Sequence, residues 1–537
     1  MKVSTRVIAC AVFACAALVD RAGASVCGDL NNNGVVDPGD STRLVQRVFS
    51  GPNATDCGGQ GTLQCGDLNG SGNLSVADLT VELNLVAQNP VIFNCTIPGT
   101  AESNVILAGS INTNRTLSGA PGSNVHTVNG TTFVSAGVIV TIQPGAVVQG
   151  VKGAATPSVL VFQRGSKINA AGTPANPIVF TSNQPNGSRG IGDWGGIVIN
   201  GNGPANCPAG ACLAEGLTSV EFGGPNPNDS SGVLQYARIE FSGIELSSDN
   251  ELNVLTQNAV GRGTVEDHIQ VNHGFDDGFE WFGGTVNMKY IVASSIGDDD
   301  FDWQLGYTGH VQFGLGIKNA NNSDTNGRHG FEGDNNENNF AFLPRSNPVF
   351  CNMTVVGTVP QGHAAGVGGR RGALLRRGTA GKIFNTIIDG FTQSGVQLDD
   401  NATAAQACLN GTTLRTAEDL LSLKHVTIFG NGTGGTVLSS GSATSPCTPG
   451  QWMTALGATI STADPNIVEA PYPSPASGAP GADGYVPTAG PATADDCESF
   501  DPGFFDPAAY EGAFAPGSGI AGNWLRDMSN VISFDTD

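Results

Sequence analysis

Short apolar runs alternate with polar turn residues along the chain between residues 101 and 447. The runs are rich in Val, Ile and Phe, Gly, Asn, Asp and Pro separate them, and no strong amphipathic helix interrupts the pattern. β-Branched and aromatic residues favour strands, and many short strands at regular spacing are typical of an all-β architecture. Composition agrees, because the 537 residues include 76 Gly and only 13% are charged. We therefore predict a mainly β fold.

The strand pattern also repeats. Residues 141–146 (TIQPGA) and 161–166 (VFQRGS) are twenty residues apart, and residues 178–181 follow as the next strand. Three further triplets recur every 21 residues, at 269–271, 290–292 and 311–313. A period of this length with about three short strands per turn predicts a right-handed parallel β-helix, in which each rung stacks about 4.8 Å from the last.

An acidic and aromatic motif recurs on neighbouring predicted rungs. Residues 276–281 (DDGFEW) return 22 residues later as 298–303 (DDDFDW), and residues 330–332 (GFE) repeat part of the motif. In an extended strand the two aromatic residues of the motif point one way and the acidic residue between them points the other. We expect the aromatic rings to stack inside the helix while Glu280 and Asp302 form a carboxylate ladder outside.

The acidic residues of this motif are a candidate metal or ligand site. Two carboxylates one rung apart repel by about 3.5 kcal/mol at an effective dielectric near 20, so the cluster must stay hydrated or recruit a cation. Closely spaced hard oxygens are what calcium needs. A hydrated acidic turn, a calcium site and a catalytic site all stay open on sequence alone. The candidate residues are Asp276, Asp277, Glu280, Asp298, Asp299, Asp300 and Asp302.

Basic residues gather in one later segment of this acidic chain, at Arg370, Arg371, Arg376, Arg377 and Lys382. They lie about seventy residues from the acidic motif, and the sequence does not place the two groups on one face. The histidines at 268, 273, 310 and 329 fall in different predicted rungs without ligand spacing, so we do not expect a histidine metal set. We assign no catalytic residue.

The pentapeptide CGDLN occurs twice near the start of the chain, at residues 27–31 and 65–69. Each copy opens a twelve-residue run in the ligand order of an EF-hand calcium loop, with Gly34 and Gly72 at the sharp turn. Apolar residues at helical spacing follow each loop. The expected ligands of the first loop are Asp29, Asn31, Asn33, the Val35 carbonyl, Asp37 and Asp40. Those of the second loop are Asp67, Asn69, Ser71, the Asn73 carbonyl, Ser75 and Asp78.

Tandem loop–helix units with Asp at the twelfth position resemble the type I dockerin module over residues 27–95. The resemblance implies calcium as a cofactor and docking to a cohesin-like protein partner. Asn33 and Ser71 stand where that family usually has Asp. The lower charge of the two loops implies a weaker hold on calcium.

Cysteine spacing predicts covalent bridges. Two pairs are each thirty residues apart, Cys27 with Cys57 and Cys65 with Cys95, which indicates one disulfide per repeat. A bridge of that loop length stabilises a small module by roughly 3 to 4 kcal/mol. Cys207 and Cys212 should close a small loop. The sequence leaves open how the last four pair, namely Cys351, Cys408, Cys447 and Cys497.

The first residues read as a secretory signal. Lys2 and Arg6 precede an apolar stretch over 7–19, and small residues at 22–24 supply a cleavage point. Export agrees with paired cysteines, because disulfides persist in oxidising compartments. No later stretch reaches the eighteen apolar residues of a membrane span. The formal net charge of −23 argues against nucleic acid as a partner.

Two stretches of the β region resemble known families. Residues 161–181, with Gly165 and the run 177–181, resemble rungs of the pectate-lyase-like β-helix superfamily. Motifs at 228–234, 238–243 and 504–514 are similar to a family of large secreted bacterial β-helix proteins. These resemblances imply the fold and an extracellular location. Enzymes of the superfamily use aspartate-bound calcium and a basic residue on acidic sugars, which the resemblance implies only as a possibility here.

The patterns divide the chain into a signal peptide (1–24), a dockerin-like calcium module (25–97), a parallel β-helix (101–447) and a connector with a C-terminal cap (448–537). We expect a secreted or cell-surface calcium-binding protein that docks through the first module. Its β-helix surface would bind polysaccharide or the cell envelope. The alternative is an extracellular polysaccharide lyase or hydrolase. The sequence does not decide whether the protein is an enzyme, which glycan it meets or its oligomeric state.

Overall fold

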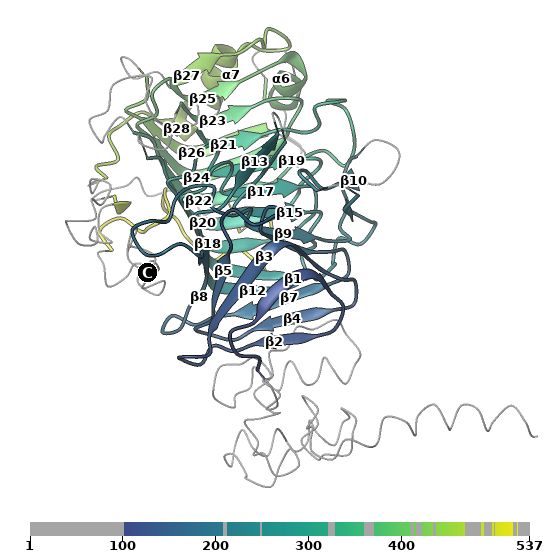
Figure 1. Cartoon of the computed structure of the whole chain (residues 1–537). Helices are drawn as coiled ribbons and strands as arrows, with labels where there is room; N and C mark the ends of the chain where they lie inside the picture. Colours follow the sequence, from purple (N-terminus) through teal and green to yellow (C-terminus); the bar gives the residue numbers. More distant parts are fainter. Residues whose placement is uncertain are drawn as a thin grey trace, which may run out of the picture. The chain divides into compact units, whose positions relative to one another are not determined.

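The computed structural model describes most of the chain after residue 100. The described residues are 44, 101–467 except 208–211, 218, 248–249, 320–327, 359–369, 410–412, 415–420 and 433–436, and then 485–487, 497–498, 500–518 and 524. The chain divides into two compact units, Met1–Ala101 and Glu102–Asp537. Figure 1 shows the second unit as strands stacked rung upon rung. The two calcium loops expected at 29–40 and 67–78 lie outside the described residues.

The β-helix begins with three-sided rungs. The strands β4, β5 and β6 pair in parallel with β7, β8 and β9 of the next rung, one pair on each face. Their bounds are β4 (Ile139–Ile142), β5 (Val147–Gly150), β6 (Val159–Phe162), β7 (Lys167–Ala171), β8 (Ile178–Ser182) and β9 (Ile197–Asn200). The stack starts with β1 (Ile106–Ile111), β2 (Arg115–Leu117) and β3 (Val125–Val134).

From β12 (Gly232–Glu240) onward, one bent strand spans two faces. The first half of β12 pairs with β7 and its second half with β8. The same form recurs in β16 (Val265–Asn272), β18 (Met288–Ser294), β20 (His310–Ile317), β22 (Val349–Val356), β24 (Gly381–Asp389) and β26 (Leu421–Phe429). The third face continues in short strands, β15 (Leu255–Asn258), β17 (Phe279–Phe282), β19 (Phe301–Gln304), β21 (His329–Gly333), β23 (Arg371–Leu375), β25 (Ser394–Leu398) and β27 (Leu438–Ser440).

Each bent strand turns at a residue in the left-handed backbone region. These residues are Tyr236, His268, Tyr290, Phe313, Asn352, Asn385 and His425, with φ between 46° and 62°. Side chains other than glycine and asparagine rarely adopt this conformation, so neighbouring contacts must compensate its cost. The first four rings stack on one another at centroid distances of 4.3, 4.6 and 5.1 Å. Ring stacking thus supports the bend in the early rungs, and asparagine amides take over in β22 and β24.

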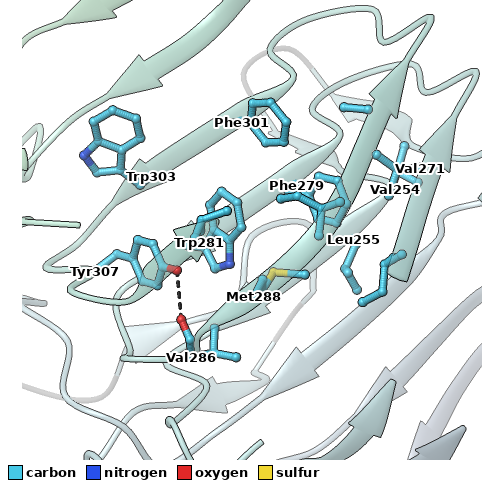
Figure 2. Close-up of a cluster of buried hydrophobic side chains, with 14 of the residues drawn as sticks. Val254, Leu255, Val271, Phe279, Trp281, Val286, Met288, Phe301, Trp303 and Tyr307 are labelled. Carbon is cyan, nitrogen blue, oxygen red and sulfur yellow. Dashed lines mark hydrogen bonds between the residues drawn. The ribbon is translucent and has the colours of Figure 1, made fainter. Parts of the chain in front are cut away.

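Aromatic rings fill the middle of the core. Phe279 stacks on Phe301 at 5.9 Å and Trp281 on Tyr307 at 5.1 Å, one rung apart (Figure 2). The Tyr307 hydroxyl donates a hydrogen bond to the Val286 carbonyl at 2.9 Å. All of these side chains are buried, as expected for the inward positions of the repeated acidic and aromatic motif. The parallel β-helix predicted from the pattern is therefore confirmed as a mainly β, parallel architecture.

The rung boundaries predicted from the repeats are wrong in two places. Residues 141–146 and 161–166 are not neighbours on one face, because β4 pairs with β7 whereas β6 pairs with β3 and β9. Their similarity comes from the same type of turn at two corners. The later triplets are out of register, since Ile269 pairs with Ile291 and Ile291 with Gly314. The rungs are 22 and 23 residues long there, not 21.

The end of the ladder carries the two described helices of this unit. β28 (Ile460–Ser461) pairs with β26, so strand pairing continues past residue 447. α7 (Pro449–Leu456) inserts Trp452 into the core and continues into η2 (Gly457–Thr459). α6 (Asn401–Ala407), which the sequence pattern did not predict, begins at Asp400, whose side chain accepts from the Thr403 backbone N–H. A disulfide joins Cys408, just after α6, to Cys447.

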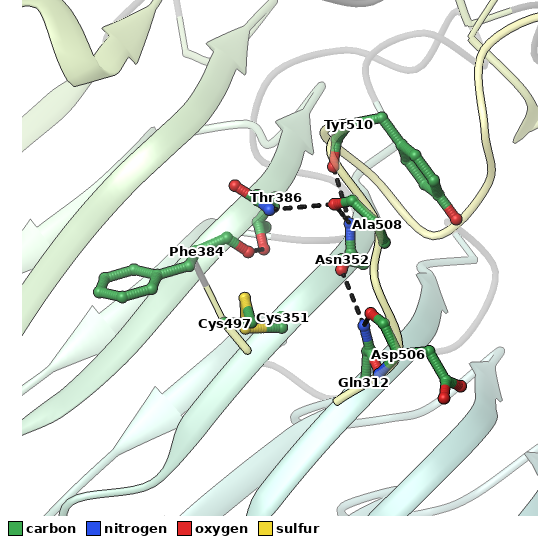
Figure 3. Close-up of a disulfide and its surroundings, with 10 residues drawn as sticks. Gln312, Cys351, Asn352, Phe384, Thr386, Cys497, Asp506, Ala508 and Tyr510 are labelled. Atoms are coloured by element: carbon green, nitrogen blue, oxygen red, sulfur yellow. Dashed lines mark hydrogen bonds between the residues drawn. A yellow bond between two sulfur atoms is a disulfide. The ribbon is translucent and has the colours of Figure 1, made fainter. Parts of the chain in front are cut away.

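A C-terminal segment lies along the side of the helix. Residues 500–518 cross the outward face of β18–β24, and a disulfide between Cys351 and Cys497 ties down their start (Figure 3). The Asn352 amide donates to the Tyr510 carbonyl at 2.7 Å, and the Gln312 amide exchanges two hydrogen bonds with the Asp506 backbone. The cap expected over 448–537 stays a prediction as a whole. Its described parts cover both the last rung and this face.

Two short antiparallel hairpins and one small bridge decorate the third face. The hairpins are β10 (Cys212–Leu213) with β11 (Glu221–Phe222) and β13 (Ile244–Ser247) with β14 (Asn250–Leu252). A disulfide joins Cys207 and Cys212, the two cysteines expected to close a small loop. Among the described residues, no helix is both long and apolar enough to cross a membrane.

Candidate functional site

The third face carries a ladder of carboxylates. β17, β19 and β21 pair in parallel, and their register places Glu280 beside Asp302 and Asp302 beside Glu332. The alternation of an extended strand sends Phe279 and Trp281 into the core and leaves these acids on the outward side. We call Glu280, Asp302 and Glu332 the acidic ladder. Strand spacing alone holds successive members about 4.8 Å apart at the backbone.

Two turns preceding these strands add further acids. The backbone N–H of Asp299 donates to Asp277 Oδ1 at 2.8 Å, and the backbone N–H of Asp298 donates to the Asp276 carbonyl at 3.3 Å. The turn before β19 therefore stacks on the turn before β17. We call Asp276, Asp277, Asp298 and Asp299 the acidic turns. They continue the ladder toward the N-terminal end of each strand.

The site is buried rather than hydrated. Side-chain burial leaves Glu280 4% exposed, Asp302 7%, Glu332 7% and Asp277 6%. A solvated acidic surface would show most of each carboxylate to water. This finding weakens the reading of the motif as a hydrated turn and leaves the two readings that require a compensating charge.

Carboxylate and imidazole atoms converge in four overlapping groups that could hold a metal ion. In each group, one ligand atom per residue lies within 4.8 Å of the others. The groups are Asp276, Asp277 and Asp298; Asp298, Asp299 and His329; Asp277, Glu280 and Asp302; and Asp299, Asp302 and Glu332. Because they share members, they form one continuous centre over three rungs.

Asp302 has no partner at the middle of this centre. Glu280 accepts hydrogen bonds from Asn253 and from Gln304, the latter at 2.9 Å, and Glu332 is ion-paired with Arg376. Asp302 Oδ1 is buried without any hydrogen bond. Burial raises the pKa of Asp302 well above its ordinary value, and the charges of Glu280 and Glu332 raise it further. This carboxylate therefore requires either a proton or a cation that its protein neighbours do not supply.

The pKa values of neighbouring acids move in the same direction. Burial is the main cause for Asp276, Asp277, Glu280 and Glu332, and all four have a pKa well above the ordinary value. Repulsion from the other carboxylates adds to it in every case. The centre thus holds more negative charge than its surroundings stabilise.

Asp300 stands apart from the four groups although it belongs to the same motif. Its carboxylate Oδ1 lies 3.0 Å from the ammonium nitrogen of Lys318, and both side chains are fully buried. Burial raises the pKa of Asp300 to about 7 against the opposing charge of Lys318. Of the seven acids expected to form the second metal or ligand site, Asp300 is the one that the structure directs to a cation of the protein itself.

His329 joins the centre, contrary to our expectation that the histidines play no part in a metal set. Its Nδ1 lies 2.8 Å from Asp299 Oδ1, and its Nε2 accepts from Arg371 Nη1 at 3.0 Å. Burial works to raise the pKa of Asp299, but the contacts with His329 outweigh it and lower the pKa to about 2. His268, His273 and His310 lie elsewhere, on the bent strands or directly after them.

The basic segment lies on the same face as the acids. Arg376 is ion-paired with Glu332 and Asp334, and Arg377 contacts Asp334 at 2.8 Å. Asp334 follows β21, and both arginines follow β23, the next strand of the face. The sequence separation of about seventy residues hid this proximity because long insertions, including 320–327 and 359–369, lengthen the two intervening rungs.

Two glutamates at the rim were missed by sequence reasoning. Glu215, between β10 and β11, and Glu251, in β14, raise the pKa of Asp276 by charge repulsion. Burial raises the pKa of Glu215 to about 7, and Glu251 adds to it. Neither residue belongs to a repeated motif, so periodicity could not reveal them. For His329, a signal existed: it stands two residues before Phe331 as Asp299 stands two before Phe301.

Comparison with known families fits this architecture. Residues 109–441 match the family model described as the pectate-lyase-like beta helix domain. The match covers more than half of the chain, so the protein belongs to that family. Neither the comparison with curated proteins nor the comparison with solved structures finds a match. Membership is compatible with carbohydrate binding or processing, but chemistry has to be argued from the site.

Proposed function

We propose that the third face of the β-helix holds a hard divalent cation, calcium by preference, and that the face so formed binds polysaccharide outside the cell. The observation that carries the proposal is the buried, unpartnered Asp302 between Glu280 and Glu332. Asp277, Glu280 and Asp302 would hold the ion, with Asp299 and Glu332 on its other side. These oxygen donors fit a cation that takes six to eight hard ligands.

Charge balance supports a cation over protonation of the whole cluster. Each pair of neighbouring ladder carboxylates repels by about 3.5 kcal/mol at an effective dielectric of about 20. Among the described residues, the cations in contact with the cluster are Lys318, Arg371, Arg376 and Arg377. They engage Asp300, His329, Glu332 and Asp334, and none contacts Asp302 or Asp277. A divalent ion at Asp302 would supply charge where the protein has none.

Polysaccharide is the partner that this face and the family favour. Arg371, Arg376 and Arg377 stay partly exposed beside the acidic centre, so a bound cation and a row of guanidinium groups would share one surface. Such a surface suits a chain of acidic sugars, because carboxylates can bridge to calcium and pair with arginine. The net charge of the whole chain would otherwise repel an acidic polymer.

Asp302→Asn tests the cation site. The substitution keeps the side-chain shape and removes the one carboxylate without a partner. Calcium at a hundred times its Kd would stabilise the wild-type chain by about 2.7 kcal/mol, and we expect the variant to lose that increment in thermal melts. Asp389→Asn is the matched control, since burial also raises the pKa of Asp389 to about 7 on another face. Equal calcium responses in all three proteins would sink the proposal.

A second candidate, a polysaccharide lyase, rests on Arg371. Its Nη1 donates to His329 Nε2 and its Nε to Gln397 Oε1 at 2.7 Å, which fixes the guanidinium beside the acidic turns. Burial lowers the pKa of Arg371 from its ordinary value. A basic residue beside bound calcium is the arrangement that superfamily lyases use on acidic sugars.

Incubation with pectins, alginates and neutral glycans separates the two candidates. A lyase produces unsaturated sugar ends that absorb in the ultraviolet, and Arg371→Gln would abolish them. Binding of a polysaccharide with no new product would favour the binding face. Arg345→Gln, at a solvent-exposed hydrogen bond away from the ladder, serves as control for either result.

We also propose that the first module binds calcium through its two loops and docks to a cohesin-like partner. The support is the duplicated ligand order at 29–40 and 67–78. Asp29→Ala with Asp67→Ala should abolish calcium-dependent capture of the chain by a cohesin domain. Unchanged capture, or none with either protein, would count against docking.

An extracellular location completes the proposal. The three disulfides among the described residues are typical of an oxidising compartment. The apolar stretch at 7–19 with small residues at 22–24 supports export. Recovery of a chain beginning at Ser25 from culture medium would test both points together.

A further inference from the structure

Lys318 and Asp300 lie in contact inside the β-helix, apart from the acidic ladder. Asp300 directly precedes β19, and Lys318 directly follows β20. The Lys318 Nζ atom lies 3.0 Å from Asp300 Oδ1, and the two side chains are 1% and 0% exposed. Nζ also donates to the Asp298 carbonyl. An amine and a carboxyl group are thus held together away from water.

The space around Asp300 is shaped for this contact. A Cβ atom on Gly316 would lie 2.6 Å from Asp300 Oδ2, so only glycine leaves room for the carboxyl group there. Gly316 pairs with Ala293 on one side and Val355 on the other, and both are buried apolar residues. Neither carboxylate oxygen of Asp300 has a hydrogen bond from the rest of the protein.

A simple ion pair is a poor explanation for this arrangement. Two charges removed from water lose hydration that their mutual attraction regains only when hydrogen bonds satisfy the remaining atoms. Asp300 has no such bonds. A neutral covalent product of the same two groups would remove both charges and leave an amide, which is far less costly to bury.

We propose that Lys318 and Asp300 are joined by an intramolecular amide bond. The ammonium group passes a proton to the carboxylate, which gives a neutral amine and a carboxylic acid. Nζ attacks Cγ of Asp300, a C–N bond forms, and the C–O bond to the hydroxyl breaks. The hydroxyl takes one proton from the nitrogen and leaves as water, so neither oxidant nor reductant is required. The Asp299 carboxylate interacts with Lys318 and can carry the proton between the two groups.

The bond would act as a covalent staple in the middle of the stack. It would link the start of β19 on the third face to the end of β20 on the bent face, across one turn of the helix. Unlike the three disulfides, it would survive reduction. It would also fix the turn that carries Asp298 and Asp299, and hence one side of the acidic centre.

Peptide mapping of the full secreted chain, reduced and alkylated, tests this directly. We expect the peptide containing Asp300 to be linked to the peptide ending in the segment of Lys318, with a mass one water below their sum. Trypsin should not cut between Lys318 and Asn319. Two separate linear peptides, with cleavage after Lys318, would overturn the proposal.

Three variants sharpen the result. Lys318→Arg should give only linear peptides, because a guanidinium does not acylate under these conditions. Asp300→Asn should restore the link with loss of ammonia in place of water. Lys289→Arg is the control, since Lys289 contacts Asp506 at 2.7 Å on the surface and should leave the link intact. A link that persists in Lys318→Arg would refute the assignment.

Discussion

At the scale of single residues, two buried acids show what surroundings do to a carboxyl group. Asp302 lies between two other carboxylates, and its pKa is raised by burial and by their charges. Glu266 lies in the apolar core between Leu234 and Met288 of the neighbouring strands. It has one partner, the Gln257 amide, which donates to Oε2 at 2.7 Å. A cation can relieve Asp302, whereas only a proton can relieve Glu266.

Glu266 should make stability depend on pH. Burial raises the pKa of Glu266 to about 8 from an ordinary value of 4.5. Between these values the folded chain keeps a proton that the unfolded chain has released, so folding binds a proton. The stabilisation is complete below the lower value and is lost as pH rises through 8. Each pH unit crossed should cost the wild type about 1.4 kcal/mol relative to Glu266→Gln.

Urea unfolding of wild type and Glu266→Gln at pH values from 5 to 9 measures this difference. Gln cannot ionise, so the two free energies of unfolding should diverge steadily over that range. Parallel curves would show that Glu266 is not held neutral in the folded chain. The comparison also cancels the contribution of the acidic ladder, which both proteins share.

At the scale of elements, the bent strands depend on the side chain at the bend. Asn352 turns β22 at φ 52° and is wholly buried. Its amide nitrogen donates to the Tyr510 carbonyl at 2.7 Å, and its oxygen accepts from Gln312 at 3.2 Å. One asparagine therefore supports a left-handed backbone and holds the C-terminal segment on the face (Figure 3).

Asn352→Ala should lower the free energy of unfolding by about 2 to 4 kcal/mol. Alanine pays more than asparagine for the left-handed conformation, and the buried Tyr510 carbonyl loses its donor. Residues 500–518 should become more sensitive to limited proteolysis. The exposed Asn338→Ala serves as control and should change neither quantity. Equal protease sensitivity in both variants would contradict the role given to Asn352.

The elements also show how far sequence reasoning reaches. The alternation in 276–281 and 298–303 predicts correctly that the aromatics face the core and that Glu280 and Asp302 stack, because side-chain direction in a strand has a fixed period. Rung length is not fixed in this way. A left-handed residue such as Tyr290 adds a bend without a turn motif, so a constant period of 21 residues placed Ile269 opposite the wrong residue.

At the scale of the whole molecule, long insertions conceal what the stack brings together. Arg376 reaches Glu332 across 44 positions, and His329 reaches Asp299 across 30. Sequence separation cannot reveal these contacts, since the inserted loops leave the helix and return to the next rung. The fold class and the acidic motif were predictable, whereas the arginines, His329 and the rim glutamates required the three-dimensional register.

The whole chain would then contain calcium in two separate places, the N-terminal loops and the third face. These can be told apart because they use different residues. Asp29→Ala with Asp67→Ala removes the first carboxylate of each proposed loop and leaves the acidic ladder unchanged. Any calcium that remains bound to this double variant should belong to the β-helix.

The most direct test is equilibrium dialysis of that double variant against calcium, with and without Asp302→Asn. We predict that the double variant retains at least one calcium ion per chain and that adding Asp302→Asn removes one ion, while adding Asp389→Asn removes none. If the double variant binds no calcium at millimolar concentrations, or if Asp302→Asn leaves the bound amount unchanged, the third face is not a calcium centre.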